Sequence, residues 1–466
     1  MKNKILNHLL VKKNSSIKET MRAIDRGGLG TAFVIDKNKK FFGLVTDGDI
    51  RRAILRGVNI GRPIEEIANK NPIVFHNEFL ERELSRPKIN KDIKKRTPIH
   101  GSLKIPVLNN KREVKDLIFV YPDGKHDFLR AKAKLNVNNE NIKKVLVIGG
   151  AGYLGSVLCR KLLNERYKVR VLDNLTYGDE GIKELYSDKN FDFLKGDIRN
   201  ISDVVEAVKD IDAVIHLAAI VGDPACASDS KKTLEINYLA TKNITEICKY
   251  FQINRFIFAS TCSIYGASLS PNKKLTEESS LNPISLYAET KIKCEQSILE
   301  ATDENFSPTI FRMATLYGFS PLMRFDLVVN LLTAKAIFDK KITIFGGSQW
   351  RPWLHISDAA NSYLLCLKKP IEKIKGEIFN VLSENYKIIE IGKIIKSLFK
   401  DAKLEINSKI TDCRDYNVSF DKISKSLGFR PKIKIKEGIK AIEKAMAEGL
   451  ISNYKDTKYR FSLPQI

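Results

Sequence analysis

The sequence of 466 residues lacks any apolar run long enough to cross a membrane. A spanning helix needs about 20 consecutive apolar residues, and the runs here are much shorter. Residues 1–14 mix lysine, asparagine and leucine, without the successive charged, apolar and small-residue regions of a signal peptide. We therefore expect a cytoplasmic protein that is not inserted in a membrane.

Closely spaced cysteine pairs are also missing. The seven cysteines are odd in number, and no two of them form a CxxC pair. Structural zinc sites need such pairs, and disulfide frameworks use even numbers of cysteines. No cluster of histidines and carboxylates has the spacing of metal ligands either. The sequence thus predicts a reduced protein without a metal site.

A basic stripe interleaved with aromatic residues, typical of nucleic-acid binding, is absent. The formal net charge is +24, but the lysines are scattered among asparagine and isoleucine. This pattern indicates solvated basic faces and small anionic ligands such as nucleotides, and no nucleic-acid partner. With 43% hydrophobic residues, the chain can bury the cores of two or three domains.

A glycine-rich turn is the feature around which the rest of the chain is organised. The apolar run Val145–Ile148 indicates a buried parallel strand, because such strands are covered on both faces. Gly149, Gly152 and Gly155 follow at intervals of three, and a helix-periodic stretch comes next. A strand, a glycine turn and a helix N-terminus form a dinucleotide fingerprint, in which the backbone approaches a diphosphate closely.

An acidic residue completes the fingerprint. Asp173 ends a second apolar run, 18 residues beyond Gly155. A carboxylate there can bind both ribose hydroxyls and repels a 2′-phosphate, which favours NAD over NADP. Further apolar stretches alternate with helical ones, at 191–197, 213–219 and 256–260. This alternation predicts an α/β fold with a doubly wound parallel (Rossmann) sheet.

A tyrosine and a lysine carry the chemistry. Tyr287 and Lys291 stand four apart in a helical stretch and so share one face. An ammonium near a phenol lowers the pKa of the phenol, which lets the tyrosine remove a proton from a substrate hydroxyl near neutral pH. Thr261, at a strand end, can hydrogen-bond to the same oxygen.

Together these motifs resemble the extended short-chain dehydrogenase/reductase family, in its nucleotide-sugar epimerase/dehydratase branch, over residues 144–450. The resemblance implies Tyr287 as the acid/base, Lys291 as its pKa-lowering partner and Thr261 as the hydroxyl partner. It implies NAD as the cofactor. Besides Tyr287 and Lys291, the residues that it places around NAD are Gly149, Gly152, Tyr153, Leu154, Gly155, Asp173, Asn174, Asp197, Ile198, Leu217, Ala218, Ala219 and Asn237.

The N-terminal region contains a weak internal repeat of about 70 residues. Two strands joined by a turn at 31–45 are echoed at 104–118. This arrangement resembles a pair of CBS modules, which bind adenine nucleotides such as AMP or ATP. The family's phosphate and ribose contacts match Thr46 and Asp49, whereas Tyr121-Pro122-Asp123-Gly124 replaces them in the second repeat. One adenosyl site is thus implied, and a purely dimerising scaffold is the alternative.

The resemblances divide the chain into four parts. An α/β CBS pair would occupy 1–130, a polar linker 131–143, the enzyme domain 144–450 and a tail 451–466. A smaller C-terminal α/β part of the enzyme domain would bind the nucleotide sugar. There Arg351 and Arg414 would hold the substrate diphosphate as planar forks. The stretch 323–326 would shape the pocket in a role that stays open.

The family that the sequence resembles includes 4-epimerases, 4,6-dehydratases, 4-keto reductases and decarboxylases. Dehydratases carry an Asp-Glu pair after the catalytic threonine, but Cys262 and Ser263 stand there, which argues against dehydration. NAD favours a redox-neutral reaction. We therefore expect an NAD-dependent nucleotide-sugar epimerase acting at C4, regulated by adenine nucleotide at the CBS pair.

Two alternatives remain open at this point. One is an NAD(P)-dependent 4-keto reductase or sugar dehydrogenase, and the other is a non-catalytic nucleotide sensor. The resemblance also implies a homodimer or a higher homo-oligomer.

Overall fold

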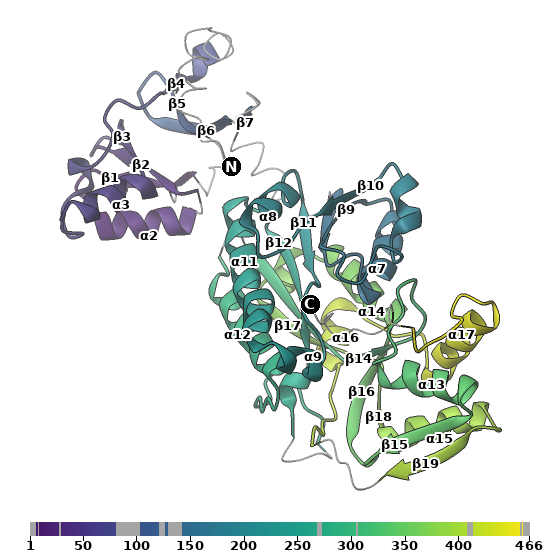
Figure 1. The fold of residues 1–466 in the computed structure, drawn as a ribbon. Helices are drawn as coiled ribbons and strands as arrows, with labels where there is room; N and C mark the ends of the chain where they lie inside the picture. Colours follow the sequence, from purple (N-terminus) through teal and green to yellow (C-terminus); the bar gives the residue numbers. More distant parts are fainter. Residues whose placement is uncertain are drawn as a thin grey trace. The chain divides into compact units, whose positions relative to one another are not determined.

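The computed structural model describes residues 6–7, 9–27, 29–80, 103–120, 126–128, 142–267, 273–303, 306–407, 413–456 and 459. The chain forms two compact units, the first Met1–Asn141 with Asp303–Asn305 and the second Ile142–Thr302 with Phe306–Ile466 (Figure 1). Most of the expected linker 131–143 lies outside the described residues, and so does Tyr121-Pro122-Asp123-Gly124.

The first unit contains the expected repeat. In each half a strand pairs in parallel with the first strand of an antiparallel hairpin. These strands are β1 (Leu10–Lys12), β2 (Thr31–Ile35) and β3 (Phe41–Thr46) in the first half, and β4 (Phe75–His76), β5 (Leu103–Leu108) and β6 (Val114–Val120) in the second, which β7 (His126–Phe128) extends. The helical segments of this unit are α2 (Ile17–Gly27), α3 (Asp47–Leu55), η1 (Ile64–Glu66) and η2 (Asn77–Phe79).

The two hairpin turns are built alike. The Asp36 carboxylate accepts hydrogen bonds from two amides of its own turn, at 2.8 and 2.9 Å. Asn109 does the same in the second hairpin, at 3.1 and 2.8 Å. Such side-chain bonds to the following backbone stabilise a turn. Phe33 of the first half and Phe119 of the second then share one hydrophobic core.

A seven-stranded parallel sheet forms the centre of the second unit. Its order is β10 (Phe191–Lys195), β9 (Lys168–Asp173), β8 (Lys144–Ile148), β11 (Ala213–His216), β12 (Arg255–Thr261), β13 (Ser307–Met313) and β17 (Glu377–Val381). The chain starts in the middle, runs out to one edge, returns past β8 and proceeds to the other edge. The predicted doubly wound Rossmann sheet is thereby confirmed.

Helices cover both faces of this sheet (Figure 1). Val145 and Val147 of β8 belong to the core under α7 (Tyr153–Asn164) and α14 (Ile356–Leu367). Leu146 and Ile148 belong to the opposite core, under α8 (Ile201–Ala207), α11 (Ala240–Tyr250) and α12 (Leu286–Glu300). Alternate residues of one strand thus enter two cores, which explains why the run is apolar throughout.

A smaller α/β part adjoins the carboxyl ends of the central strands. It contains two further sheets, β14 (Thr315–Tyr317) with β16 (Trp350–His355) and β18 (Glu384–Lys387), and β15 (Lys341–Phe345) with β19 (Lys403–Asn407). The helices α13 (Val328–Phe338), α15 (Ile388–Leu398) and α17 (Ile435–Ala447) pack with them around the fully buried Trp353.

The remaining short helices of the second unit are η3 (Lys183–Ser187), α9 (Asp223–Ser228), α10 (Ser230–Thr233), η4 (Leu234–Leu239), η5 (Cys262–Tyr265), η6 (Ile371–Lys373) and α16 (Asp421–Leu427). No helix in the described ranges combines the length and apolar character needed to cross a membrane.

The described part of the expected tail packs against the rest of the second unit. Tyr454 stacks on Phe338, with ring centroids 5.8 Å apart, and it also contacts Phe325. Tyr459 meets the same Phe325 edge to face at 5.4 Å. Phe325, Tyr454 and Tyr459 belong to a core that they share with α13 and α17.

Candidate active site

A cavity of about 1030 Å³ opens where the strand order of the central sheet reverses. Gly149, which follows β8, and Ala218, which follows β11, line one end of it, and residues of the smaller α/β part line the other end. Doubly wound sheets bind ligands at this topological switch point. The cavity is large enough for a dinucleotide and a second nucleotide-sized molecule.

The glycine turn forms the floor of the cavity. Gly149 has φ +85°, and a Cβ there would lie 2.6 Å from the Ala218 nitrogen. A Cβ on Gly155 would lie 2.4 Å from the Gly149 oxygen. At Gly149 and Gly155 the backbone is therefore packed too closely to leave room for a side chain. The helix α7 begins directly after Gly152, which is its N-cap residue. This is a cradle that fits the diphosphate of NAD.

Replacing Gly155 with alanine should lower the thermal stability of the enzyme unit and weaken NAD binding, because the new Cβ would overlap backbone atoms. The matched control is Gly152→Ala, whose Cβ would meet its nearest neighbour, the Gly149 oxygen, at an ordinary 3.4 Å. We expect Gly155→Ala to cost about 1–3 kcal/mol in scanning calorimetry without NAD, and Gly152→Ala to cost much less. Equal losses in the two variants would contradict this account.

Asp173 is fixed beside the glycine turn. Its Oδ2 accepts a hydrogen bond from the Ala151 nitrogen at 3.0 Å, and its Oδ1 accepts one from the Leu175 nitrogen at 2.9 Å. Burial raises the pKa of Asp173, and these backbone donors oppose that rise. Each oxygen keeps further acceptor capacity, which fits the predicted ribose contact.

The predicted cofactor residues converge on this cavity with one exception. Its lining contains Gly149, Gly152, Tyr153, Leu154, Gly155, Asp173, Asn174, Asp197, Ile198, Leu217, Ala218, Ala219, Tyr287 and Lys291. Asn237 is buried and does not line the cavity. Its Oδ1 accepts a hydrogen bond from the Ile220 nitrogen at 2.8 Å, and its Nδ2 donates to the Ile220 oxygen at 2.9 Å. In this structure Asn237 therefore holds the loop after β11 instead of facing the cavity.

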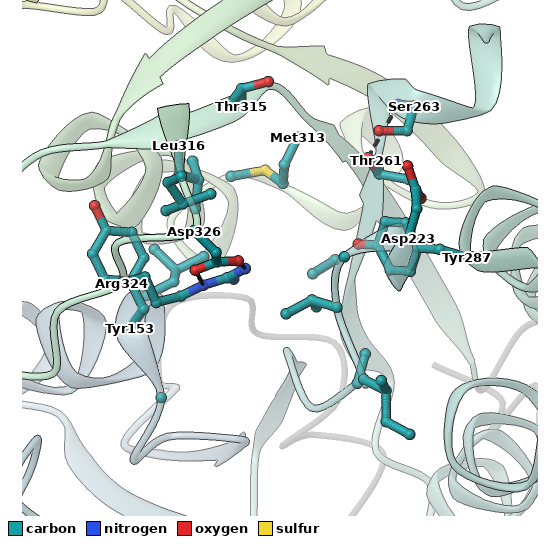
Figure 2. Close-up of a pocket in the computed structure, with 18 of the residues that line it drawn as sticks. Tyr153, Asp223, Thr261, Ser263, Tyr287, Met313, Thr315, Leu316, Arg324 and Asp326 are labelled. Carbon is teal, nitrogen blue, oxygen red and sulfur yellow. Dashed lines mark hydrogen bonds and ion pairs between the residues drawn. The ribbon is translucent and has the colours of Figure 1, made fainter. Parts of the chain in front are cut away.

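Two of the predicted catalytic residues, Thr261 and Tyr287, lie together on one wall (Figure 2), and Lys291 also lines the cavity. The Ser285 hydroxyl caps α12 by accepting from the Ala288 nitrogen at 3.3 Å, so Tyr287 lies in the first turn. Thr261, at the end of β12, lies near the Tyr287 hydroxyl and opposes the rise in its pKa. Lys291, one turn further on, donates from Nζ to the Ala259 oxygen at 2.8 Å.

Burial has the largest effect on the pKa of Tyr287. Burial raises the pKa of Tyr287 above its ordinary value, and the contacts with Thr261 and Arg324 only partly oppose this. Lys291 lies 5.9 Å above the Tyr287 ring and 4.5 Å above the Phe258 ring, so its ammonium faces rings and a carbonyl. In the protein alone, desolvation of the phenolate outweighs the neighbouring charges, and the lowering of the Tyr287 pKa by Lys291 stays a prediction.

The two predicted substrate arginines also line the cavity. Arg351 is buried on β16, donates from Nη1 to the Arg414 carbonyl and lies 5.2 Å from the centroid of the Tyr416 ring. Arg414 forms an ion pair with Asp223, 2.6 Å from Nη1 to Oδ2. Arg351 thus holds the segment that carries Arg414, and the binding of a diphosphate by the two stays a prediction.

Sequence reasoning missed the role of three charged residues of the cavity. Asp223 lies on the wall of Tyr287, whereas Arg324 and Asp326 lie on the opposite wall beside Tyr153 (Figure 2). The Arg324 Nε and Nη2 atoms lie 3.0 and 2.5 Å from the two Asp326 carboxylate oxygens. The stretch 323–326 was expected to shape the pocket, and two of its residues do line the cavity, but the sequence did not indicate that Arg324 and Asp326 pair with each other. Asp223 gave no signal at all.

In the first unit, Thr46 and Asp49 form a helix cap. The Asp49 nitrogen donates to the Thr46 hydroxyl at 3.2 Å, and the Thr46 nitrogen donates to Asp49 Oδ2 at 2.9 Å. Arg52 pairs with the other carboxylate oxygen at 2.7 Å. This capping box accounts for both residues structurally, and their contact with an adenosyl group stays a prediction.

Comparison with known proteins decides the family. The profile described as NAD dependent epimerase/dehydratase family matches residues 145–381, about half of the chain. The chain belongs to this family. A CBS domain profile matches residues 5–56 of the same chain, within the first unit. Among the residues with described positions, no group of three or more His, Cys, Asp or Glu side chains could hold a metal ion.

The relatives of this family member include epimerases and dehydratases. A putative UDP-glucose 4-epimerase of Methanocaldococcus jannaschii is 31% identical over 307 residues, covering 64% of this chain and 96% of the relative. A Bacillus cereus UDP-glucuronic acid 4-epimerase, solved with UDP-glucuronic acid and NAD, is 28% identical with a TM-score of 0.59, covering 66% and 99%. A Bacillus anthracis dTDP-glucose 4,6-dehydratase, solved with NAD, is 25% identical with a TM-score of 0.59, covering 66% and 98%.

The family member is an NAD-dependent enzyme of the nucleotide-sugar epimerase/dehydratase kind. NAD is its cofactor, and the glycine cradle with Asp173 fits that group.

Proposed function

We propose that the enzyme is an NAD-dependent nucleotide-sugar 4-epimerase. Tyr287 removes the proton of the sugar 4-hydroxyl, and Thr261 hydrogen-bonds to the same oxygen. Lys291 supports Tyr287 from the next turn of α12. NAD, when bound, supplies the hydride acceptor and donor for C4. Arg351 and Arg414 anchor the diphosphate, so that the sugar can present either face to the same tyrosine.

The observation that carries the choice of epimerase over dehydratase is the residue pair after Thr261. Elimination of water across C5 and C6 needs a second acid and base near the sugar. Cys262 is buried and donates to the Arg312 carbonyl at 3.2 Å, and burial raises the pKa of its thiol. Ser263 has a hydroxyl, 3.4 Å from the Tyr416 hydroxyl. Neither side chain can serve as a carboxylate acid or base.

The decisive experiment is incubation of the full chain with UDP-, GDP-, CDP- and dTDP-sugars and NAD, followed by NMR of the sugar. Inversion at C4 without net NADH supports the proposal and names the substrate. A 4-keto-6-deoxy product would make the enzyme a dehydratase. Turnover only of a 4-keto sugar with NAD(P)H would make it a reductase, and no turnover of any sugar would favour a nucleotide sensor.

The CBS domain suggests regulation of this activity by an adenine nucleotide. AMP or ATP should bind near Thr46 and Asp49 and change the rate of epimerisation. The matching measurement is titration of each nucleotide into wild type and Asp49→Ala, by calorimetry and in the turnover assay. Binding that is unchanged in Asp49→Ala would contradict this site.

A further inference from the structure

The side chain of Tyr153 extends from the glycine turn to residues of the smaller α/β part, on the other side of the cavity (Figure 2). Tyr153 is the first residue of α7, within the glycine triplet. Its buried hydroxyl donates to the Gly318 oxygen at 2.6 Å and accepts from Asn330 Nδ2 at 3.1 Å. Gly318 follows β14 and Asn330 lies on α13, so both partners are more than 160 residues away in the chain.

Asn330 links the Tyr153 hydroxyl to the segment 318–330, which carries the Arg324–Asp326 ion pair. Its Oδ1 accepts from the Gly318 nitrogen at 3.0 Å, and its Nδ2 also donates to the Arg324 oxygen at 2.9 Å. Asn330 is fully buried, and these bonds occupy its carbonyl and both amide hydrogens. A buried network in which each group has its partner favours one arrangement over others.

A second set of contacts ties the same two segments. The Ser320 hydroxyl donates to the backbone oxygen of Tyr153 at 2.8 Å and lies 2.9 Å from the Ser156 hydroxyl. Gly318 has φ +112°, and a Cβ there would lie 2.4 Å from His355 Nε2. The start of the segment 318–330 is therefore tied to α7 through Ser320 and packed against His355 at Gly318.

From this network we infer that Tyr153 and Asn330 are positioning residues. They fix the segment 318–330, and with it the Arg324–Asp326 pair, to the helix end that receives the diphosphate of NAD. Binding of NAD at one end of the cavity therefore organises the opposite, sugar-facing wall. The inference rests on the proposed function only in taking that wall as the place of the sugar.

Tyr153→Phe tests this inference, because it removes one hydroxyl from the network. The matched control is Tyr363→Phe. Tyr363 is fully buried on α14, and its hydroxyl has no hydrogen-bond partner among the described residues. We expect Tyr153→Phe to raise KM for the nucleotide sugar about fivefold to tenfold and to leave Kd for NAD within twofold. Tyr363→Phe should change neither quantity.

Hydrogen exchange measured on the full chain gives a readout that does not depend on turnover. In wild type and Tyr363→Phe, NAD should slow exchange both at 149–156 and at 318–330. In Tyr153→Phe, NAD should slow exchange at 149–156 only. Asn330→Ala, which releases the Arg324 carbonyl by another route, should behave like Tyr153→Phe.

Three outcomes would overturn the inference. In the first, NAD leaves exchange at 318–330 unchanged in wild type, which decides the matter even if a variant does not fold. In the second, Tyr153→Phe and Tyr363→Phe behave alike. In the third, Tyr153→Phe weakens NAD binding without changing KM, which would make Tyr153 a cofactor contact only. If the sugar assay shows no turnover, the proposed function fails, while the exchange experiment still tests the network.

Discussion

Replacing Tyr287 with phenylalanine should lower kcat for epimerisation by about 10²- to 10⁴-fold, the usual contribution of a positioned acid/base. The ring of Tyr287 packs beside Ile220, Ala225 and Cys226, and phenylalanine preserves that packing. The expected loss therefore reflects the hydroxyl alone. The measurement is kcat with the sugar identified by the NMR panel, together with Kd for NAD from calorimetry.

Binding of NAD and thermal stability should stay near those of wild type in Tyr287→Phe. Tyr363→Phe again serves as the control for losing a buried hydroxyl, and it should keep full activity. If Tyr287→Phe retained more than about a tenth of the wild-type kcat, another group would have to move the proton, and the assignment of Tyr287 would be wrong.

Replacing Glu295 with leucine should lower the free energy of unfolding of the enzyme unit by about 3–5 kcal/mol. Glu295 and Arg312 form an ion pair at 2.8 Å, and each side chain is only 4% exposed. The Ser260 hydroxyl also donates to Glu295, directly before the catalytic Thr261. Removing the carboxylate leaves the Arg312 charge buried without its partner. Urea unfolding, followed through the transition of the enzyme unit, measures the loss.

Two controls separate this effect from a general loss of packing. Glu295→Leu combined with Arg312→Leu should recover much of the stability, because no buried charge remains. Glu206→Leu removes one partner of the exposed pair with Lys209 and should change stability by no more than about 0.5 kcal/mol. A double variant as unstable as the single one would indicate that packing, and not the charge, causes the loss.

The sequence predicted those features that depend on neighbours along the chain. The strand, glycine turn and helix at 144–164 are set by local apolar pattern and backbone freedom, and all three are observed. The cofactor and catalytic residues lie at the ends of parallel strands or beside them, so fold class alone brings them to one edge of the sheet. That is why the cavity contains nearly the whole predicted set.

Side-chain partners distant in the sequence could not be predicted. The Arg414–Asp223 pair joins residues 191 positions apart, and no periodicity marks Asp223. Asn237 fits a family motif, but its amide is committed to Ile220. Both sets of contacts depend on how the loops pack against the sheet. Tertiary packing of this kind cannot be read from the local sequence pattern.

The motif at Thr46 illustrates a different limit. A hydroxyl and a carboxylate three residues apart suit both a nucleotide contact and a helix capping box. The structure has the capping box, with Arg52 on the remaining carboxylate oxygen. The two interpretations share one spacing, so spacing alone could not distinguish them.

The aromatic contacts after α17 restrict how the end of the enzyme unit can vary. Tyr454 and Tyr459 both touch Phe325, the residue between Arg324 and Asp326. A change of length or of ring size in that C-terminal stretch would therefore reach the sugar-facing wall, although the stretch lies far along the chain from the glycine turn. A substitution at Tyr454 or Tyr459 should therefore shift Phe325 and, with it, the two charged side chains on either side of Phe325.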